Sequence, residues 1–132
     1  MSRVSTPGQD KTWEAAADLS ASQFCLVTGV AGPAGGVQAR VNLTTGRGIG
    51  ILQNKPSAAG QGAVVRLSGT SKLKVDGSGT AIAAGDPIRA TTGGVGIKAV
   101  TDKDPVSAIA MEPSVANGDI IEVLIQKFDL AV

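Results

Sequence analysis

Short β-prone runs separated by turn residues make up the chain from about residue 22 to its end. The runs recur roughly every ten residues, and Gly, Pro, Asn and Asp fill the gaps between them. No segment after residue 20 repeats its apolar residues at a sustained helical spacing. This pattern predicts an all-β fold, either a sandwich or a barrel, rather than alternating βαβ units.

Nine strands are expected in this region, and they cover residues 24–28, 37–42, 48–52, 63–68, 72–75, 87–91, 96–100, 108–111 and 120–126. Lys72 and Lys74 alternate with apolar neighbours, which predicts a strand with a charged outer face. The last strand is different, because Ile120 and Leu124 make its second face apolar as well. A strand that is apolar on both faces is either central in its sheet or covers a partner surface.

An internal repeat links two parts of the chain, 50–67 and 108–124. Each part has a short apolar run, then Pro-Ser, then Ala and Gly, and then a longer apolar run. Pro56 and Pro113 each end the first strand, because proline has no N–H to donate to a sheet. The repeat predicts two similar hairpin-like units within one β-domain, too few for a solenoid. The glycines that permit the return turn are Gly60 or Gly62 in the first unit and Gly118 in the second.

Residues 1–20 differ in character from the rest of the chain. They are polar, contain Pro7-Gly8, and hold the only tryptophan, Trp13. The run 11–18 has the composition for one or two helical turns, but so short a helix is unstable alone. We therefore expect an extended N-terminal arm over 1–20 and one β-domain over 21–132.

Trp13 is the first candidate for contact with another protein. Tryptophan is costly to leave in water and is enriched among interface hot spots. The alternative is that the arm folds back and Trp13 caps its own barrel. Leu19 and Phe24 complete the set of candidate protein-interaction residues.

The chain has no histidine and a single cysteine. The absence of histidine removes the commonest general base, the Ser-His and Cys-His nucleophile systems, and the most frequent ligand of transition metals. Cys25 lies within an apolar run and is expected to be a buried small hydrophobe. We therefore expect a protein that is not an enzyme, with no catalytic residue, no cofactor and no metal site.

Two further segments have features of a binding site. The glycine run at 46–50 resembles a phosphate-binding loop, but Pro56 interrupts the helix that should follow it. A glycine-rich turn, or a strand in close backbone contact, accounts for it better. The acidic stretch 102–104, with Glu112 nearby, has carboxylates that could hold a hard cation, but an exposed polar loop is favoured.

Charge is nearly balanced, with 12 Lys and Arg against 11 Asp and Glu. No run of one sign is present, whereas a nucleic acid or an anionic membrane would call for clustered Lys and Arg. No apolar stretch reaches the length of a signal peptide or of a bilayer span. We expect a protein made in the cytoplasm, with neither nucleic acid nor membrane as a partner.

The core must come mainly from Val, Ile and Leu, because the chain has only two Phe and one Trp and no Tyr. The 18 glycines raise the entropy cost of folding. Association with other subunits is a common remedy for such a thin core.

Several segments of the body follow one another in a familiar order, namely Pro56-Ser-Ala-Ala-Gly60, Ala63-Val-Val-Arg-Leu-Ser-Gly69, Ala83-Ala-Gly-Asp-Pro-Ile-Arg89, Gly96-Ile-Lys98 and the repeat unit at 108–124. Together they resemble the small head-decoration, or cement, proteins of tailed bacteriophages, over about residues 22–126. The resemblance implies a Gly- and Ala-rich antiparallel β-barrel or sandwich. It implies a homotrimer on the outer capsid surface of the virion, at local threefold positions, bound to the major capsid protein. The arm is not part of the matching pattern.

The function implied by this resemblance is to stabilise the head by bridging capsomers, in a protein made in the host cytoplasm. Two other functions stay open at this point. The first is another virion or surface-assembly β-module, such as a fibre base, a tail component or an adhesin domain. The second is a small-molecule-binding barrel or an unusual enzyme, which should show a deep pocket with convergent polar groups.

Overall fold

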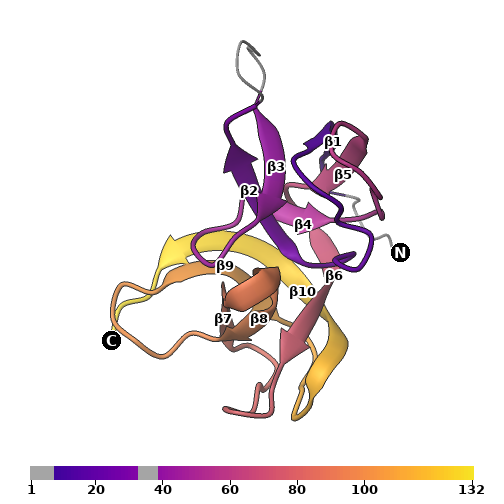
Figure 1. Ribbon diagram of the computed structural model, residues 1–132. Coiled ribbons are helices and arrows are strands. Elements are labelled where there is room, and N and C mark those ends of the chain that lie inside the picture. The colour runs from indigo at the N-terminus through magenta and orange to yellow at the C-terminus, as the bar shows by residue number, and fades with distance from the viewer. Residues whose placement is uncertain (1–7, 33–38) are drawn as a thin grey trace, which may run out of the picture.

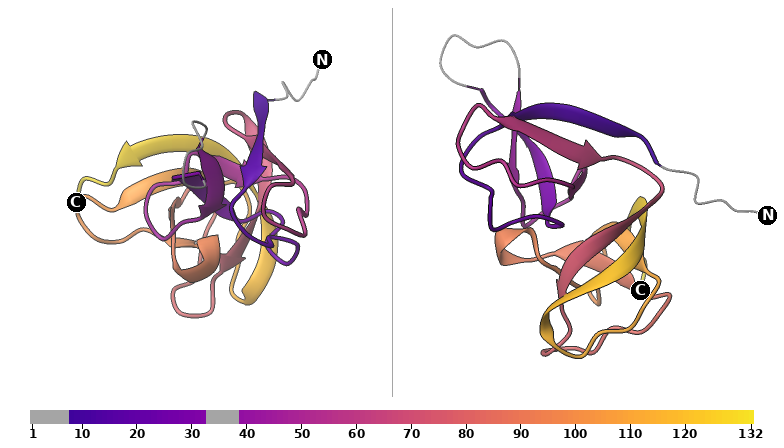
Figure 2. Two further views of the ribbon diagram at one scale, coloured as in Figure 1. Left: turned by 45° about the horizontal axis from the view of Figure 1, so that its top comes forward. Right: turned by 90° about the vertical axis from the view of Figure 1, so that its right-hand side faces the viewer.

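The computed structural model describes residues 8–32 and 39–132. Within these residues, ten strands form two closed five-stranded barrels, stacked one on the other (Figures 1 and 2). The all-β prediction is confirmed, and a single 3-10 turn, η1 (Thr92–Gly94), interrupts the second barrel. The first barrel contains β1 (Asp10–Ala15), β2 (Leu26–Val30), β3 (Arg40–Leu43), β4 (Gly50–Leu52) and β5 (Gly62–Arg66). The second contains β6 (Thr70–Asp76), β7 (Pro87–Ala90), β8 (Gly96–Lys98), β9 (Pro105–Ala110) and β10 (Asn117–Asp129).

Each of the nine expected strands overlaps an observed one, and the strand without a prediction is β1. It pairs antiparallel with β5 and parallel with β3, and so closes the first barrel. The expectation of an extended arm over 1–20 therefore fails between residues 10 and 15, and residues 1–7 lie outside the described part of the chain. The reason is that Trp13 and Ala15 alternate with polar residues, which gives β1 one apolar face for the barrel core.

The two barrels have the same strand topology. When the five strands of each barrel are counted in chain order, neighbours around the ring follow the order first, third, second, fourth and fifth, and the fifth pairs with the first. In each barrel the parallel pair joins the first and third strands, and the other pairs are antiparallel. The two sequence repeats are the fourth and fifth strands of each ring, β4–β5 and β9–β10. The two repeat units therefore belong to different barrels.

Glycines of left-handed conformation lie near the start of the last strand of each barrel, Gly60 just before β5 and Gly118 at the bulge in the first residues of β10. Gly60 has a φ of 90° and Gly118 a φ of 88°. Residues with a side chain rarely adopt this conformation. The turn in the first repeat is thus made by Gly60, whereas Gly62 begins β5.

Neighbouring residues of β2 and β4 point into two different cores. Val27 and Leu52 lie in the core of the first barrel, whereas Leu26 and Ile51 lie in the core of the second. Successive side chains of a strand point to opposite faces, so both strands are buried on both sides at these positions. The two barrels therefore meet through a continuous apolar contact.

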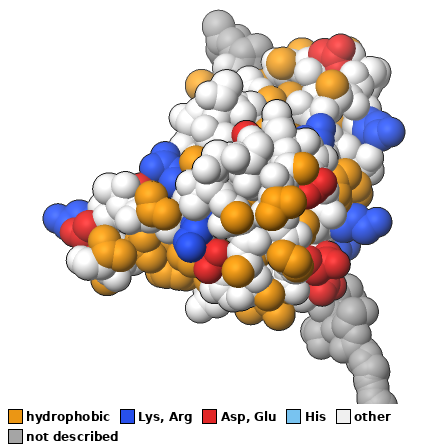
Figure 3. Space-filling view, turned by 90° about the horizontal axis from the view of Figure 1, so that it is seen from below, with side chains coloured by type: hydrophobic (Ala, Val, Ile, Leu, Met, Phe, Trp, Pro, Cys, Tyr) orange, Lys and Arg blue, Asp and Glu red, His pale blue; other side chains and the backbone are white. Residues whose placement is uncertain are grey.

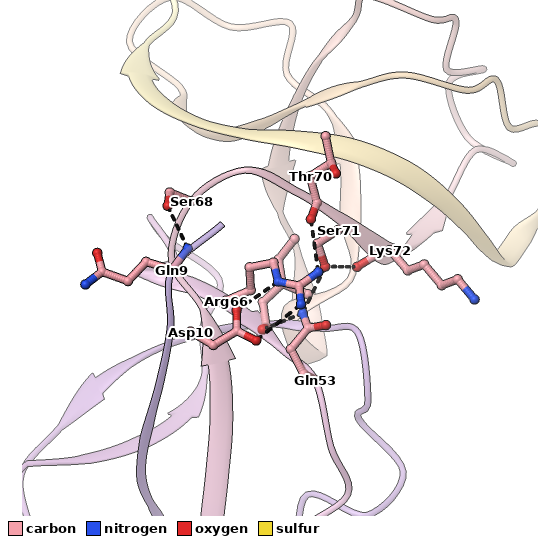
Figure 4. A network of polar contacts seen from close by, with 9 residues as sticks. Gln9, Asp10, Gln53, Arg66, Ser68, Thr70, Ser71 and Lys72 are labelled. Carbon is pink, nitrogen blue, oxygen red and sulfur yellow. Dashed lines mark hydrogen bonds and ion pairs between the residues drawn. The ribbon is translucent and has the colours of Figure 1, made fainter. Parts of the chain in front are cut away.

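Polar contacts tie the first strand to the connection between the barrels (Figure 4). The Arg66 guanidinium donates to both carboxylate oxygens of Asp10, at 2.8 and 3.2 Å, and to the Thr70 carbonyl at 3.2 Å. The Gln53 side-chain amide donates to the Ser71 hydroxyl at 2.9 Å, from the first barrel to the second. These bonds fix the start of β6 against the end of β5.

A second set of polar contacts joins the β3–β4 loop to the second barrel. Arg47 forms an ion pair with Asp129 and also donates to the Phe128 carbonyl at 3.0 Å. The Gly48 amide donates to the Ser107 hydroxyl at 3.1 Å. Together with the shared apolar contact, these bonds hold the two barrels in one arrangement.

Candidate protein-interaction surface

No group of three or more Cys, Asp or Glu side chains among the described residues is placed to hold a metal ion. Over the same residues, no helix has the length and apolar character needed to cross a membrane. Cys25 is buried, as expected, and burial raises the pKa of its thiol. A buried thiol with a raised pKa is a poor nucleophile.

The glycine run at 46–50 leads into a strand, not a helix. A Cβ at Gly50 would lie 2.2 Å from the Arg66 carbonyl oxygen, so the strand runs in close backbone contact with β5. Gly46 and Gly48 lie in the loop between β3 and β4, so each of the two structural interpretations holds for part of the run.

The acidic stretch 102–104 is only partly the exposed loop that was expected. Asp104 is buried and pairs with Arg89 at 2.8 Å. The backbone amides of Thr101 and Val100 and the Arg89 guanidinium all donate hydrogen bonds to the Asp104 carboxylate. These bonds hold the pKa of Asp104 below its usual value, and the bond from Thr101 has the largest effect. This carboxylate therefore orders its own loop.

Trp13 is half-buried and packs against the core of the first barrel. It pairs with Ala63 of β5, and the Lys11 ammonium lies 5.4 Å from its ring centroid. A hollow of about 440 Å³ beside the ring leaves part of it accessible. The interpretation that Trp13 covers its own barrel accounts for these contacts.

Replacing Trp13 by alanine is expected to lower the free energy of unfolding by about 2 kcal/mol, less than a fully buried tryptophan would cost. Thr12→Ala, an exposed change in the same strand, is the matched control and should shift stability by less than about 0.5 kcal/mol. Urea denaturation followed by circular dichroism measures both. Equal stability of the two variants would show that Trp13 does not support the barrel.

Leu19 is 2 % exposed and lies in the core of the first barrel. Its amide donates to the Pro56 carbonyl at 2.8 Å. The structure therefore leaves Leu19 no surface for a partner, contrary to the expectation. The reason is that the segment between β1 and β2 turns back across the barrel and does not project as an arm.

Phe24 lies between the two barrels with its backbone in an unusual conformation. Its φ of 66° is left-handed, which is strained for a bulky residue. Its amide donates to the Leu52 carbonyl at 2.7 Å, and its own carbonyl accepts from the Lys74 amide at 2.8 Å. One residue thus bonds to both barrels. Its ring packs on the core of the second barrel and remains partly exposed.

Two adjoining hollows, of about 650 and 280 Å³, are both lined by Phe24 and Ile120. We call this surface the junction groove. Phe24 and Ile120 lie at its centre. Its basic residues are Lys55, Arg66, Lys72 and Lys74, and its acidic residues are Glu112 and Glu122.

Opposite charges lie side by side along the junction groove. Lys72 and Glu122 are direct cross-strand partners in the register of β6 and β10. They form no ion pair with each other or with any other residue in the described ranges. The Lys72 ammonium lies 5.8 Å from the Phe24 ring centroid instead. The alternation of Lys72 and Lys74 with buried residues confirms the predicted charged outer face of this strand.

Ile120 belongs to the groove, although sequence analysis did not select it as a contact residue. The available signal was the second apolar face of its strand. Ile121 and Val123 fill the core, whereas Ile120 and Leu124 are 49 % and 36 % exposed on the outer face. β10 is paired along both edges, with β6 and β9, and its outer face is apolar and exposed at these two residues.

The far end of the second barrel has a mixed surface. Hydrophobic, basic and acidic side chains are interspersed on the face seen from below (Figure 3). Nucleic-acid binding calls for basic side chains gathered in one patch, and this face does not gather them.

No protein-family model matches the chain, and no curated protein sequence matches it. Solved structures do match. One is described as the head fiber gp8.5 N base in bacteriophage phi29, with a TM-score of 0.66 and 15 % sequence identity. The likeness covers 94 % of this chain and 98 % of that chain. Over nearly its whole length, this chain is therefore similar in fold to the base of a phage head fibre.

Proposed function

We propose that this chain is a structural protein of a phage virion that binds the outer surface of the head and acts by protein contact, without catalysis. The observation that carries the proposal is the fold likeness, over 94 % of this chain, to a protein described as part of a phage head fibre. The resemblance of residues 22–126 to head-decoration proteins supports the same role from the sequence.

In its finer form, the proposal is that the chain binds the major capsid protein as a homotrimer at local threefold positions and bridges capsomers. A cement protein needs a complementary surface and no chemistry. Two barrels held in one arrangement, with exposed apolar residues on β10, offer such a surface. Many copies arranged by the symmetry of a shell would act together through multivalency.

A second candidate is the base of a head fibre. The observation that favours it is the description of the similar structure as an N base. A base holds a shaft on the head, whereas a cement protein bridges capsomers and so stabilises the shell itself. The two roles therefore differ in what binding does to the melting temperature of the head.

Co-sedimentation of the purified chain with expanded heads of the phage that encodes it tests the proposal. We expect saturable binding to these heads and none to heads of an unrelated phage. A rise in the melting temperature of the decorated heads supports the cement role, and binding without a rise supports the fibre base. Absence of binding to the phage's own heads would contradict both.

A further inference from the structure

We infer that copies of this chain contact one another through the junction groove, with the lysines of β6 in one copy against the glutamates beside β10 in the next. This inference rests on the proposed function in one respect, namely that several copies of the chain assemble. The junction groove is the surface through which they would do so.

The centre of the groove is apolar and open to solvent. The inner face of β10 packs on the core of its own barrel. Its outer face has no strand packed over it among the residues described. Ile120 is half-exposed there, and Leu124 lies on the same face four residues further along. An exposed apolar strand face beside an aromatic ring is typical of a protein contact.

Phe24 supplies the aromatic anchor. Its strained backbone is held by hydrogen bonds to both barrels, so the ring is fixed in place before any partner arrives. Buried aromatic residues near the centre of an interface commonly carry much of the binding energy. Strained residues of this kind cluster at functional sites.

The charges of the groove favour a second copy as the occupant. Arg66 is already paired with Asp10, which leaves Lys55, Lys72 and Lys74 against Glu112 and Glu122. None of these five forms an ion pair within the described residues. A surface of one sign would repel its own copy, whereas a surface with unpaired charges of both signs offers each copy partners for the charges of the next.

Symmetry brings the opposite charges together. When the outer faces of two copies meet across a twofold axis parallel to the strands, β6 of each lies against β10 of the other. Around a threefold axis, the β6 side of each copy lies against the β10 side of the next. In both arrangements lysine meets glutamate, while Ile120 and Phe24 lie near the axis.

Sedimentation equilibrium of the full chain tests this inference. The wild type is expected to show a mass above the 13.1 kDa of the monomer, rising with concentration. Ile120→Arg places a charge at the centre of the contact and is expected to raise the dissociation constant by roughly tenfold or more. Val115→Arg is the matched control, because Val115 is 74 % exposed in the β9–β10 turn and does not line the groove. It should keep the wild-type mass.

A charge exchange separates a second copy from a foreign partner. Lys74→Glu and Glu122→Lys are each expected to weaken assembly, because each places like charges in contact between copies. Within its own copy Lys74 faces Ile120 across the strands, not a carboxylate. The double variant exchanges the two signs and should restore assembly toward the wild-type level, since every copy then carries the exchanged pair. A monomeric wild type at all concentrations, an Ile120→Arg variant with the wild-type mass, or a double variant no better than the single ones would overturn the inference.

Head binding measured on the same proteins separates this inference from the proposed function. If Ile120→Arg is monomeric and still binds heads, the groove joins copies and another face meets the shell. If the wild type assembles and binds no heads, the inference stands and the proposed function fails.

Discussion

Replacing Leu26 by alanine is expected to lower the free energy of unfolding by about 2–5 kcal/mol. Leu26 belongs to β2 of the first barrel, yet its side chain is 1 % exposed and lies in the core of the second. Val27 points the opposite way and holds β2 in its own barrel, so the strand cannot move to fill the space. The variant therefore leaves a cavity at the contact between the barrels. Urea denaturation measures the loss.

Leu124→Ala provides the matched control, because it makes the same chemical change on the outer face of β10. At a concentration where the chain is monomeric, it should cost less than about 1 kcal/mol. Trp13 is the only tryptophan, so its fluorescence reports on the first barrel, while far-ultraviolet circular dichroism reports on both. In Leu26→Ala the two signals should shift together. Equal losses in the two leucine variants, or a shift in one signal alone, would contradict an apolar contact that couples the two barrels.

Replacing Gly94 by alanine is expected to cost about 1–3 kcal/mol more than replacing Gly93. Both glycines have a φ of 74°, so the backbone strain of an added side chain is the same at the two positions. A Cβ at Gly93 meets nothing within 4 Å, whereas one at Gly94 would lie 2.4 Å from the Leu26 carbonyl oxygen. A backbone oxygen cannot rotate away, so η1 would have to move off β2. Thermal denaturation of the pair measures the difference.

Equal melting temperatures for the two glycine variants would show that η1 tolerates displacement from the first barrel. The expected difference instead means that Gly94 and Leu26 form one contact, in which the second barrel approaches β2 too closely for any side chain. These two positions therefore test the same junction, one by removing atoms and the other by adding them.

The strands that sequence analysis placed correctly are those whose pattern is local. Lys72–Val75 alternates charged and apolar residues between turn residues, and β6 lies there with the expected face outward. β1 was not predicted, because only Trp13 and Ala15 face the core and charged residues surround them in the sequence. Its partners, β3 and β5, are distant in the sequence, so no local pattern predicts this strand.

The division into two barrels is not visible in the pattern of single strands. Leu26-Val27 and Ile51-Leu52 are each buried on both sides, which is equally typical of a central strand in one large sheet. In the structure each pair divides its side chains between two cores. The internal repeat did signal duplication, but its two halves are too short to show that each closes a ring of its own.

The interaction surface was only partly predictable. Phe24 lies in the junction groove, but Leu19 is buried in a core and Trp13 packs on the first barrel. The pairing of Lys72 with Glu122 depends on the register of two strands some fifty residues apart, which spacing alone cannot supply.

Electron cryo-microscopy of expanded heads, incubated with an excess of the chain, tests the central claim most directly. The account predicts added density at repeated positions on the outer surface of the shell, into which two stacked five-stranded barrels fit. A shell that stays bare under these conditions would contradict it.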